Sequence, residues 1–473
     1  MKKLFLIIPF LFLFIHIMRA DDGPGSWTQT LSSNYQVWQD GIVINSTNPT
    51  IMYAGTNGNG VYKTTNAGVN WTESNTGLSN LGVQCMAISK SNPDVVMCGT
   101  TNGGTNPGVY VSTNGGSSWT LKNNGITETG ILPQAIAIDP TNANIAYTVI
   151  FNGTADAVNG VFKTTNMGDN WFVSNTGIGA IKNFLCIAVN PMNPNVIYIG
   201  SSFAVVTSTG PQKIYKSVNG GALWTDMSNG LPQLSSDINP VRSLSISTAD
   251  TGIVLAGLFQ NTTTNGGMFF TTNGGGQWTK RQNGLPNVAG ALIRAVLIRP
   301  GSNTEFYAGY DGTAPSTGIW RTTNQGASWT SFAGGPLLST YVVRALGFRT
   351  SDSTLFAGVA GTGGGYGVYE YTFVPVGVKG NESNIPKEFA LYPNYPNPFN
   401  PVTSIRYDVP KNANVTLKVY DIRGRVVATL INENKLPGSY ITSFDASNLS
   451  SGVYFYRISA GDFARTMKMI LVK

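Results

Sequence analysis

Three arginines recur at one position of a repeated sequence, and together they could bind an acidic group. Arg242, Arg294 and Arg344 each stand directly before a small residue at the start of a short apolar stretch. Guanidinium groups offer paired N–H donors, which suit a carboxylate, a sulfate or an acidic sugar. The alternative interpretation is that these arginines pair with Asp40, with backbone carbonyls or with water.

Histidine chemistry is excluded from the mature protein. The only histidine, His16, lies in a segment that we expect to be removed during export. Without histidine, the chain cannot form a Ser-His-Asp triad, a His-ligated zinc site or a histidine general base. We therefore expect no metal and no cofactor.

Carboxylates are the remaining candidates for catalysis. A glycoside hydrolase needs two of them across the scissile bond. The acidic residues that we expect on the same face as the arginines are Asp40, Asp156, Asp237, Asp311 and Glu128. None forms a recognisable pair, so the sequence favours a non-catalytic protein. A polysaccharide hydrolase or lyase that uses Asp40 and Asp311 is the alternative.

The arginines belong to a repeat of about 50 residues. Its tract GVYKTTN, or a variant, starts at Gly60, Gly108, Gly160, Lys213, Gly267, Gly318 and Gly367. Each unit contains four short strand-like segments separated by Gly, Asn and Pro turns, which is typical of a β-propeller blade. Seven units predict seven blades. The segment at Trp27 looks like the end of a unit, so we expect the N-terminal strand to complete the seventh blade and remove the exposed sheet edges.

A small residue follows Arg242, Arg294 and Arg344, and the same position is small in the other four units. It is occupied by Gly41, Cys85, Ala135, Cys186, Ser243, Ala295 and Ala345. Small residues are expected where the innermost strands converge on the propeller axis. The cysteines are therefore interpreted as small buried residues, and a disulfide between Cys85 and Cys98 is the alternative.

Six units contain the turn Asn-x-Gly-x-x-Trp. Its residues are Asn66, Gly68 and Trp71; Asn114, Gly116 and Trp119; Asn166, Gly168 and Trp171; Asn219, Gly221 and Trp224; Asn273, Gly275 and Trp278; and Asn324, Gly326 and Trp329. Asn can bond its own turn, Gly supplies a positive φ and Trp packs between blades, so we predict a structural clasp rather than six binding sites.

This turn resembles the Asp-box, or BNR repeat, of sialidases, sortilin-type receptors and xyloglucanase-like propellers, with Asn in place of Asp. The resemblance covers roughly residues 22–373. In that family the turn lies on the face away from the ligand, which implies that the arginines lie on the ligand-binding face. Sialidase-like propellers also clamp a carboxylate with three arginines. However, they have six blades, and their catalytic motifs cannot be placed in this chain.

Trp38 is the one tryptophan that the repeat leaves unexplained, and it lies close to Asp40 in the chain. With Tyr310, Phe203 and Phe259, which we expect in loops, it could stack on a sugar ring. An aromatic residue that merely covers the rim of the propeller is the alternative.

The ends of the chain predict export. Lys2 and Lys3 precede an apolar run that ends near Ala20, so residues 1–20 are interpreted as a signal peptide, and no later segment could span a membrane. Residues 21–373 contain 15 basic and 16 acidic residues, whereas residues 374–473 contain 12 and 7. The nearly neutral large part gives no reason to expect nucleic-acid binding.

Residues 374–388 have the composition of a linker, and residues 389–473 predict a small β-sandwich. This tail resembles the type A C-terminal sorting domain of the type IX secretion system. The matching motifs are YPNPFNP (395–401), VYDIRGRVV (419–427), SGVYFYRI (451–458) and the terminal KMILVK. The resemblance implies recognition by the secretion machinery of a Gram-negative bacterium and a mature protein that is secreted or on the cell surface. An immunoglobulin-like adhesive domain is the alternative.

The sequence thus predicts an all-β protein, with a seven-bladed propeller at 21–373 and an immunoglobulin-like sandwich at 389–473. The function that we expect is non-catalytic recognition of an extracellular glycan, an acidic ligand or a protein. A surface scaffold or assembly factor, similar to the single-propeller proteins that assist photosystem assembly, is a further alternative.

Overall fold

The structure is a computed structural model that describes residues 27–32, 36–101, 103–126, 131–151, 159–179, 182–202, 213–232, 239–263, 265–311, 317–332, 341–360, 365–373, 386, 388–394, 397–435 and 437–472. The predicted signal peptide and most of the predicted linker lie outside these residues, as do Asp156, Asp237, Glu128 and Phe203. The described chain divides into two compact units, one within residues 24–374 and one from 375 onward.

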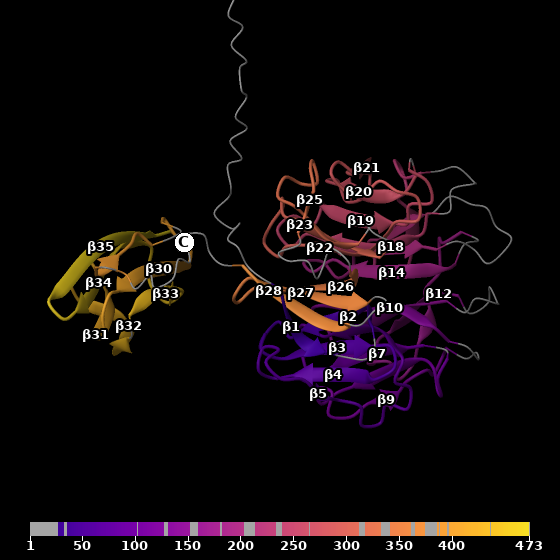
Figure 1. Ribbon diagram of the computed structural model, residues 1–473, viewed down its shortest axis with the longest axis horizontal. Helices are drawn as coiled ribbons and strands as arrows, with labels where there is room; N and C mark the ends of the chain where they lie inside the picture. The colour runs from indigo at the N-terminus through magenta and orange to yellow at the C-terminus, as the bar shows by residue number, and fades with distance from the viewer. Residues whose placement is uncertain are drawn as a thin grey trace, which may run out of the picture. The chain divides into compact units, whose positions relative to one another are not determined.

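Each repeat of the first unit folds into a four-stranded antiparallel sheet, here called a blade (Figure 1). The first strands are β2 (Val37–Ile44), β6 (Val83–Ile88), β10 (Pro133–Ile138), β14 (Phe184–Val189), β18 (Val241–Ile246), β22 (Leu292–Ile298) and β26 (Val342–Arg349). The second strands are β3 (Met52–Thr56), β7 (Val96–Thr100), β11 (Ala146–Ile150), β15 (Ile197–Ser201), β19 (Val254–Leu258), β23 (Phe306–Asp311) and β27 (Thr354–Ala360). The second strands are almost entirely buried, because neighbouring blades cover both of their faces.

The outer half of each blade holds shorter strands. The third strands are β4 (Gly60–Thr64), β8 (Val109–Ser112), β12 (Gly160–Thr164), β16 (Ile214–Ser217), β20 (Gly267–Thr271), β24 (Gly318–Thr322) and β28 (Gly367–Thr372). The fourth strands are β5 (Thr72–Glu73), β9 (Thr120–Leu121), β13 (Phe172–Val173), β17 (Trp224–Asp226), β21 (Thr279–Lys280), β25 (Thr330–Ser331) and β1 (Trp27–Ser32). The described residues of this unit thus form seven blades, numbered 1 to 7 by the order of their first strands.

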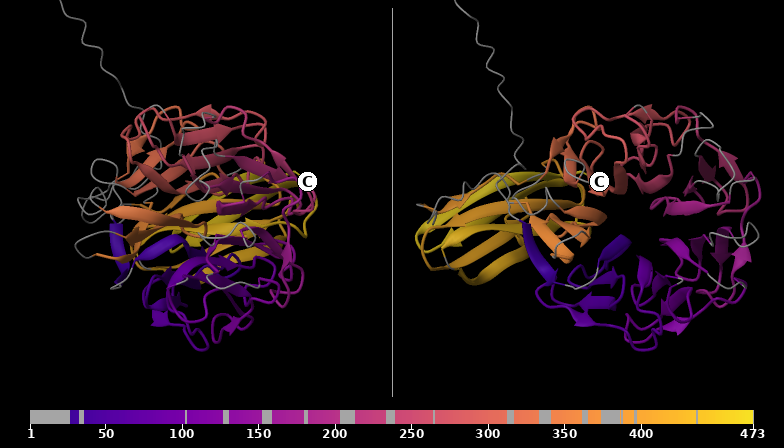
Figure 2. Two further views of the ribbon diagram at one scale, coloured as in Figure 1. Left: turned by 90° about the vertical axis from the view of Figure 1, so that its right-hand side faces the viewer. Right: turned by 45° about the vertical axis from the view of Figure 1, so that its right-hand side comes forward.

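The blades are arranged in a ring (Figure 2). The first strands contact one another in the closed circuit β2, β6, β10, β14, β18, β22, β26 and back to β2. Blade 7 joins the two ends of the unit, because β1 pairs antiparallel with β28, with Trp27 opposite Tyr371. The N-terminal strand therefore closes the ring, as the sequence predicted.

The Asn-x-Gly-x-x-Trp turns connect third and fourth strands and are held by their own side chains. In blade 1, Asn66 Oδ1 accepts hydrogen bonds from Asn70 N and from Thr64 Oγ1, both at 2.9 Å. The amide of Gly68, whose φ is 94°, donates to Thr64 Oγ1 at 3.0 Å. The same bonds form at Asn114, Asn166, Asn219, Asn273 and Asn324. The side chain of each Asn is therefore used within its own turn.

The tryptophans of these turns connect adjacent blades. The indole Nε1 atoms of Trp119, Trp171, Trp224, Trp278 and Trp329 each donate to a backbone carbonyl of the preceding blade. Trp27 and Trp71 flank the point where the ring closes, and their buried Nε1 atoms have no hydrogen-bond partner within the described part of the chain. The closure is thus the least completely bonded junction among those described.

A tyrosine and a cation face the turn of the following blade in three of the blades. In blade 1, Tyr53 and Lys63 are cross-strand partners and both donate to the carbonyl of Gly115. Gly220 and Gly274 accept from the corresponding pairs, Tyr147 with Lys163 and Tyr198 with Lys216. Three blades that instead carry apolar residues at the tyrosine position are followed by turns with Ala67, Met167 and Gln325 in place of this glycine.

The second unit is a β-sandwich with its own core. One sheet has the order β29 (Ala390–Leu391), β30 (Val402–Val409), β33 (Gly438–Asp445). The other has the order β32 (Val426–Lys435), β31 (Ala413–Tyr420), β34 (Gly452–Ala460), β35 (Phe463–Leu471). Apolar side chains from both sheets form one buried cluster, as alternation in the strands predicted. The Tyr456 hydroxyl at its edge accepts from Asn394 N and donates to Tyr392 O.

Candidate functional site

A bulge in each first strand directs one side chain toward the centre of the ring. Six first strands carry one unpaired residue directly before the small position, and β2 carries more. These residues are Gln84, Gln134, Leu185, Arg242, Arg294 and Arg344. A bulge leaves its extra residue outside the ladder and re-aims its side chain. The backbone thus explains why the three predicted arginines share a position.

Blade 1 has a longer insertion at the same place. Val37 pairs with Thr56 and the next paired residue is Ile42, opposite Ala54. Trp38, Gln39 and Asp40 therefore stand where the other blades have one bulge residue. Asp40 takes a left-handed conformation, with φ of 52°, which aspartate tolerates better than most residues. The sequence did not reveal this insertion, because Gly41 aligns with the other small residues.

The Gln39 side chain crosses the ring. It is 5 % exposed, and its Nε2 donates to the backbone carbonyl of Arg242 in blade 5. Blades 1 and 5 are not neighbours in the circuit of first strands. The insertion of blade 1 therefore obstructs the central channel at the level of the Arg242 backbone.

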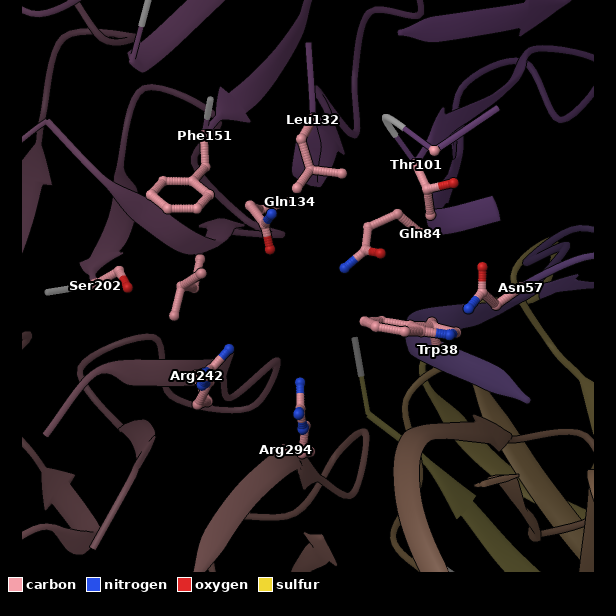
Figure 3. Close-up of a pocket in the computed structure, with 12 residues that line it drawn as sticks. Trp38, Asn57, Gln84, Thr101, Leu132, Gln134, Phe151, Ser202, Arg242 and Arg294 are labelled. Carbon is pink, nitrogen blue, oxygen red and sulfur yellow. The ribbon is translucent and has the colours of Figure 1, made fainter. Parts of the chain in front are cut away.

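A pocket of about 470 Å³ lies at this centre (Figure 3). It is lined by Trp38, Asn57, Gln84, Thr101, Gly103, Leu132, Gln134, Phe151, Leu185, Ser202, Arg242 and Arg294. Figure 3 shows the Trp38 ring, the two amides of Gln84 and Gln134, and both guanidinium groups pointing into one opening. Because the strands of a blade alternate in direction, this end of the ring is opposite the Asn-x-Gly-x-x-Trp turns.

The lining comes from two sets of residues, of which sequence reasoning identified one. The bulge residues form the first set. The residues that end or follow the second strands form the other, and they include Asn57, Thr101, Phe151 and Ser202. Asp311 holds the same position in blade 6 but is not among the lining residues. Aligning the repeats at the end of the second strand would have identified the second set.

Asp311 binds two of the three arginines. Its Oδ2 accepts from Arg294 Nε at 2.7 Å and from Arg344 Nε at 3.0 Å, and all three side chains are largely buried. Arg344 also donates to Gln36 Oε1 at 2.5 Å, and its Cζ lies 5.0 Å from the centre of the Trp38 ring. Arg294 and Arg344 thus pair with a carboxylate, as the alternative interpretation allowed, but this carboxylate is Asp311 rather than Asp40.

Arg242 has no such partner. Its buried Nε has no hydrogen bond to any residue that the structure describes, while its guanidinium lines the pocket. Burial, and next the positive charge of Arg294, lower the pKa of Arg242 to about 10. The group remains charged at neutral pH, and a buried charge without a partner is costly. An anion in the pocket would supply the missing partner.

Asp40 lies near the thiols of two first strands rather than beside the arginines that line the pocket. Burial raises the pKa of the Cys85 and Cys186 thiols, and the negative charge of Asp40 raises both further, which places Asp40 near the axis beside blades 2 and 4. Water within the ring reaches its side chain, yet protein surrounds it, and this partial dehydration raises the pKa of Asp40 to about 6. Asp40 is not among the residues that line the pocket.

The aromatic residues divide between the pocket and the core. Trp38 lines the pocket, and Phe259 follows β19 and is half-buried. Tyr310 lies within β23, is 0 % exposed and packs edge-on against Trp320, so the expectation that it lies in a loop is wrong. Tyr310 aligns with Thr56 and Ser201 at the ends of other second strands, a signal in the repeat that would have placed it correctly.

The three cysteines are free and buried, so Cys85 and Cys98 form no disulfide. Among the described residues, no group of three or more His, Cys, Asp or Glu side chains could hold a metal ion. No helix of the described part of the chain is long and apolar enough to cross a membrane.

Residues 394–473 match the family of secretion system C-terminal sorting domains. The tail is a type IX sorting domain. Such a domain implies recognition by the secretion machinery and a protein that is secreted or on the cell surface. No curated protein matches the sequence.

Solved propeller structures are similar to this chain. YCF48 from Cyanidioschyzon merolae is 16 % identical with a TM-score of 0.46, over 75 % of this chain and 100 % of that one. PorZ of Porphyromonas gingivalis, described as an essential surface component of the type IX secretion system, is 14 % identical with a TM-score of 0.48, over 90 % and 58 %. An ancestral GH74 enzyme is 15 % identical with a TM-score of 0.44, over 94 % and 63 %. The architecture follows from the sheet topology rather than from these distant similarities.

Proposed function

We propose that the protein is a non-catalytic recognition module, delivered by its sorting domain to the outside of the cell, that binds an extracellular glycan or another acidic ligand in the central pocket. The observation that carries this proposal is the guanidinium of Arg242 in that pocket, whose buried Nε has no hydrogen-bond partner among the described residues. The volume of about 470 Å³ falls within the range of roughly 300–1,000 Å³ that is usual for ligand sites. The other lining residues include three amides, two hydroxyls and one indole, which suit a hydroxylated ligand, beside the apolar side chains of Leu132, Phe151 and Leu185.

A glycan array probed with the full chain tests this function, with an Arg242→Met variant beside it. We expect wild-type protein to bind acidic glycans and the variant to lose most of that binding. Lys90→Met is the control, because it removes the same charge from an exposed side chain. Equal loss in both variants would contradict the proposal and indicate nonspecific attraction.

Catalysis is tested on the same glycans by following the release of reducing ends. The hydrolase alternative assigns the chemistry to Asp40 and Asp311. In the structure, Asp311 Oδ2 is occupied by two guanidinium groups and Asp40 lies outside the pocket lining. We therefore expect no turnover, and turnover abolished by Asp311→Asn would establish the hydrolase instead.

A surface scaffold is the second candidate, and an exposed apolar patch favours it. Phe172 and Val173 of β13 are each 62 % exposed, and Val218 and Leu223 of the next turn are 65 % and 49 % exposed. Five other blades have threonine followed by a polar residue in this strand, as at Thr72 and Glu73, and blade 2 has Thr120 followed by Leu121. Cross-linking on the cell surface compares wild type with a variant that carries Phe172→Thr and Val173→Glu. A protein partner lost only in this variant would support the scaffold.

A further inference from the structure

The pocket has two chemically different sides, and this asymmetry restricts its ligand. Blades 1 to 3 contribute Trp38 and the uncharged amides of Asn57, Gln84 and Gln134. Blades 5 and 6 contribute the guanidinium groups of Arg242 and Arg294. Figure 3 shows the two sides facing each other across the opening. A ligand that fills the pocket therefore needs an anionic end and a hydroxylated body.

The anionic end fits between the two arginines. Arg294 is among the main causes that lower the pKa of Arg242, so the two positive charges lie close enough to repel each other. Asp311 binds Arg294 through its Nε, and the guanidinium of Arg294 also lines the pocket. A carboxylate between the two groups would relieve the repulsion and could accept from both.

The hydroxylated body fits the opposite side. Arg344 covers Trp38 at 5.0 Å, and the Trp38 ring still projects into the opening. The face of a sugar ring packs well on an aromatic side chain, and its hydroxyls match amide donors and acceptors. No hydrogen bond of the Gln84 or Gln134 side chain is present among the described residues, so both amides are available to a ligand.

The obstruction of the channel decides how a chain can enter. Gln39 reaches from blade 1 to the backbone of Arg242 in blade 5, and it is itself outside the pocket lining. A chain that enters the pocket along the axis therefore meets Gln39 at its inner end. This arrangement favours a ligand that enters with one end.

We propose that the pocket recognises a terminal acidic sugar of an extracellular glycan, with its carboxylate between Arg242 and Arg294 and its ring against Trp38. Asp311 acts as a positioning residue, because it fixes Arg294 beside Arg242 and Arg344 beneath Trp38. This inference rests on the proposed function and specifies the ligand of the same pocket.

Three trisaccharides test the terminal preference, with affinities for the full chain measured by calorimetry. The first ends in glucuronic acid at its non-reducing end, the second has glucose there, and the third has glucuronic acid only at the internal position. We expect the first to bind at least tenfold more tightly than the others. Equal affinity for the first and third would overturn the inference and leave the recognition function standing. No binding of any acidic glycan would overturn both.

Asp311→Asn tests the positioning role, because it makes the site more positive. If Asp311 acts only through its negative charge, Asp311→Asn should bind the acidic trisaccharide more tightly than wild type. If Asp311 positions the arginines, the folded variant should bind it at least tenfold more weakly. Asp352→Asn is the matched control, since it breaks the bridge of Asp352 with Arg349, at 2.7 Å, in another part of blade 7. Tighter binding by Asp311→Asn, or equal loss in the control, would contradict the positioning role. Gln134→Ala gives a second test of the pocket without changing its charge, and we expect it to weaken binding.

Discussion

Glu305 accepts a hydrogen bond from Arg321 Nε at 3.0 Å, and both side chains are 7 % exposed. Arg321 and Tyr307 are the blade 6 counterparts of Lys63 and Tyr53, cross-strand partners that elsewhere donate to the turn of the next blade. Blade 7 has no such turn, because its fourth strand comes from the N-terminus. Tyr307 and Arg321 donate to Glu305 instead, so this carboxylate replaces the missing turn carbonyl.

Glu305→Gln should therefore strongly destabilise the propeller. Arg299 also binds Glu305, at 2.8 Å, so the variant leaves two guanidinium groups with a neutral partner. Breaking a buried ion pair from one side costs about 3–5 kcal/mol in the free energy of unfolding. All nine tryptophans lie between residues 27 and 329, so their fluorescence in urea reports on this unit within the full chain. A loss below about 1 kcal/mol would contradict the role of Glu305.

The pH dependence gives a second readout of this carboxylate. Burial alone would raise the pKa of Glu305, but the Tyr307 hydrogen bond and the charges of Arg321 and Arg299 outweigh it, and the net shift is downward. A lowered folded-state pKa contributes stability above the unfolded value, about 4.3, and the contribution is lost as the pH falls below it. Wild type should thus lose more stability on acidification than Glu305→Gln.

Gly274→Ala should destabilise the junction between blades 4 and 5. A Cβ on Gly274 would lie 2.9 Å from Lys216 Nζ and 3.2 Å from Tyr198 Oη, at a φ of 65°. The left-handed conformation alone costs a residue with a Cβ about 1–2 kcal/mol. Gln325→Gly is the control, because Gln325 holds the same turn position at a φ of 59° behind an apolar blade. We expect its urea midpoint to stay near or above wild type, because the left-handed strain that glycine relieves offsets the entropy that it adds to the unfolded chain. An equal fall in the two variants would refute the steric explanation.

The tryptophan clasps should differ in their contribution to stability. Trp119 Nε1 donates to Ser74 O at 2.7 Å, so Trp119→Phe leaves that carbonyl without its partner, at a cost of about 1–3 kcal/mol. Trp71 makes no such bond and is less buried, so Trp71→Phe should cost at least about 1 kcal/mol less. Thermal unfolding of the two variants measures this difference in stability. A larger loss of stability for Trp71→Phe would show that closure of the ring depends on that indole.

The sequence predicted those features that each repeat carries within itself. The four strands, the turn at Asn66 and the small position at Cys85 depend on local patterns, and seven copies of the pattern reinforced one another. Closure by the strand at Trp27 could be predicted because the last repeat lacks its fourth strand and the N-terminal segment supplies one. The residue that follows each turn Asn could also have been predicted. Glycine occurs at this position, as at Gly274, when the preceding blade carries a lysine such as Lys216 that donates to it.

The candidate site was less predictable, because it is built between repeats. Asp311 and Arg344 belong to different blades, and only the packing of blade 6 against blade 7 brings them within 3.0 Å. The reach of Gln39 to blade 5 depends on the diameter of the channel, which no local pattern encodes. Such contacts depend on the whole fold, and the insertion at Trp38 was hidden by its alignment with ordinary first strands.

Asp40→Asn should stabilise the protein above pH 6. The folded-state pKa of Asp40 is about 6, raised by burial, whereas an unfolded aspartate titrates near 3.9. The native state therefore binds a proton more tightly, and the free energy of unfolding falls as the pH rises from about 4 to 6. Water in the channel reaches the side chain, so the effect is smaller than full burial would give. Asparagine keeps the shape and tolerates the φ of 52°.

Urea midpoints at pH 4, 5, 6 and 7 measure the effect of Asp40. We expect the difference between Asp40→Asn and wild type to grow with pH across this window and to level off above pH 6. Asp250→Asn is the control, because Asp250 lies in a turn on the outside and caps Gly252 N at 2.9 Å. A difference that does not change with pH would show that the Asp40 carboxyl titrates as an ordinary surface group, and its place near the channel axis would then need another explanation.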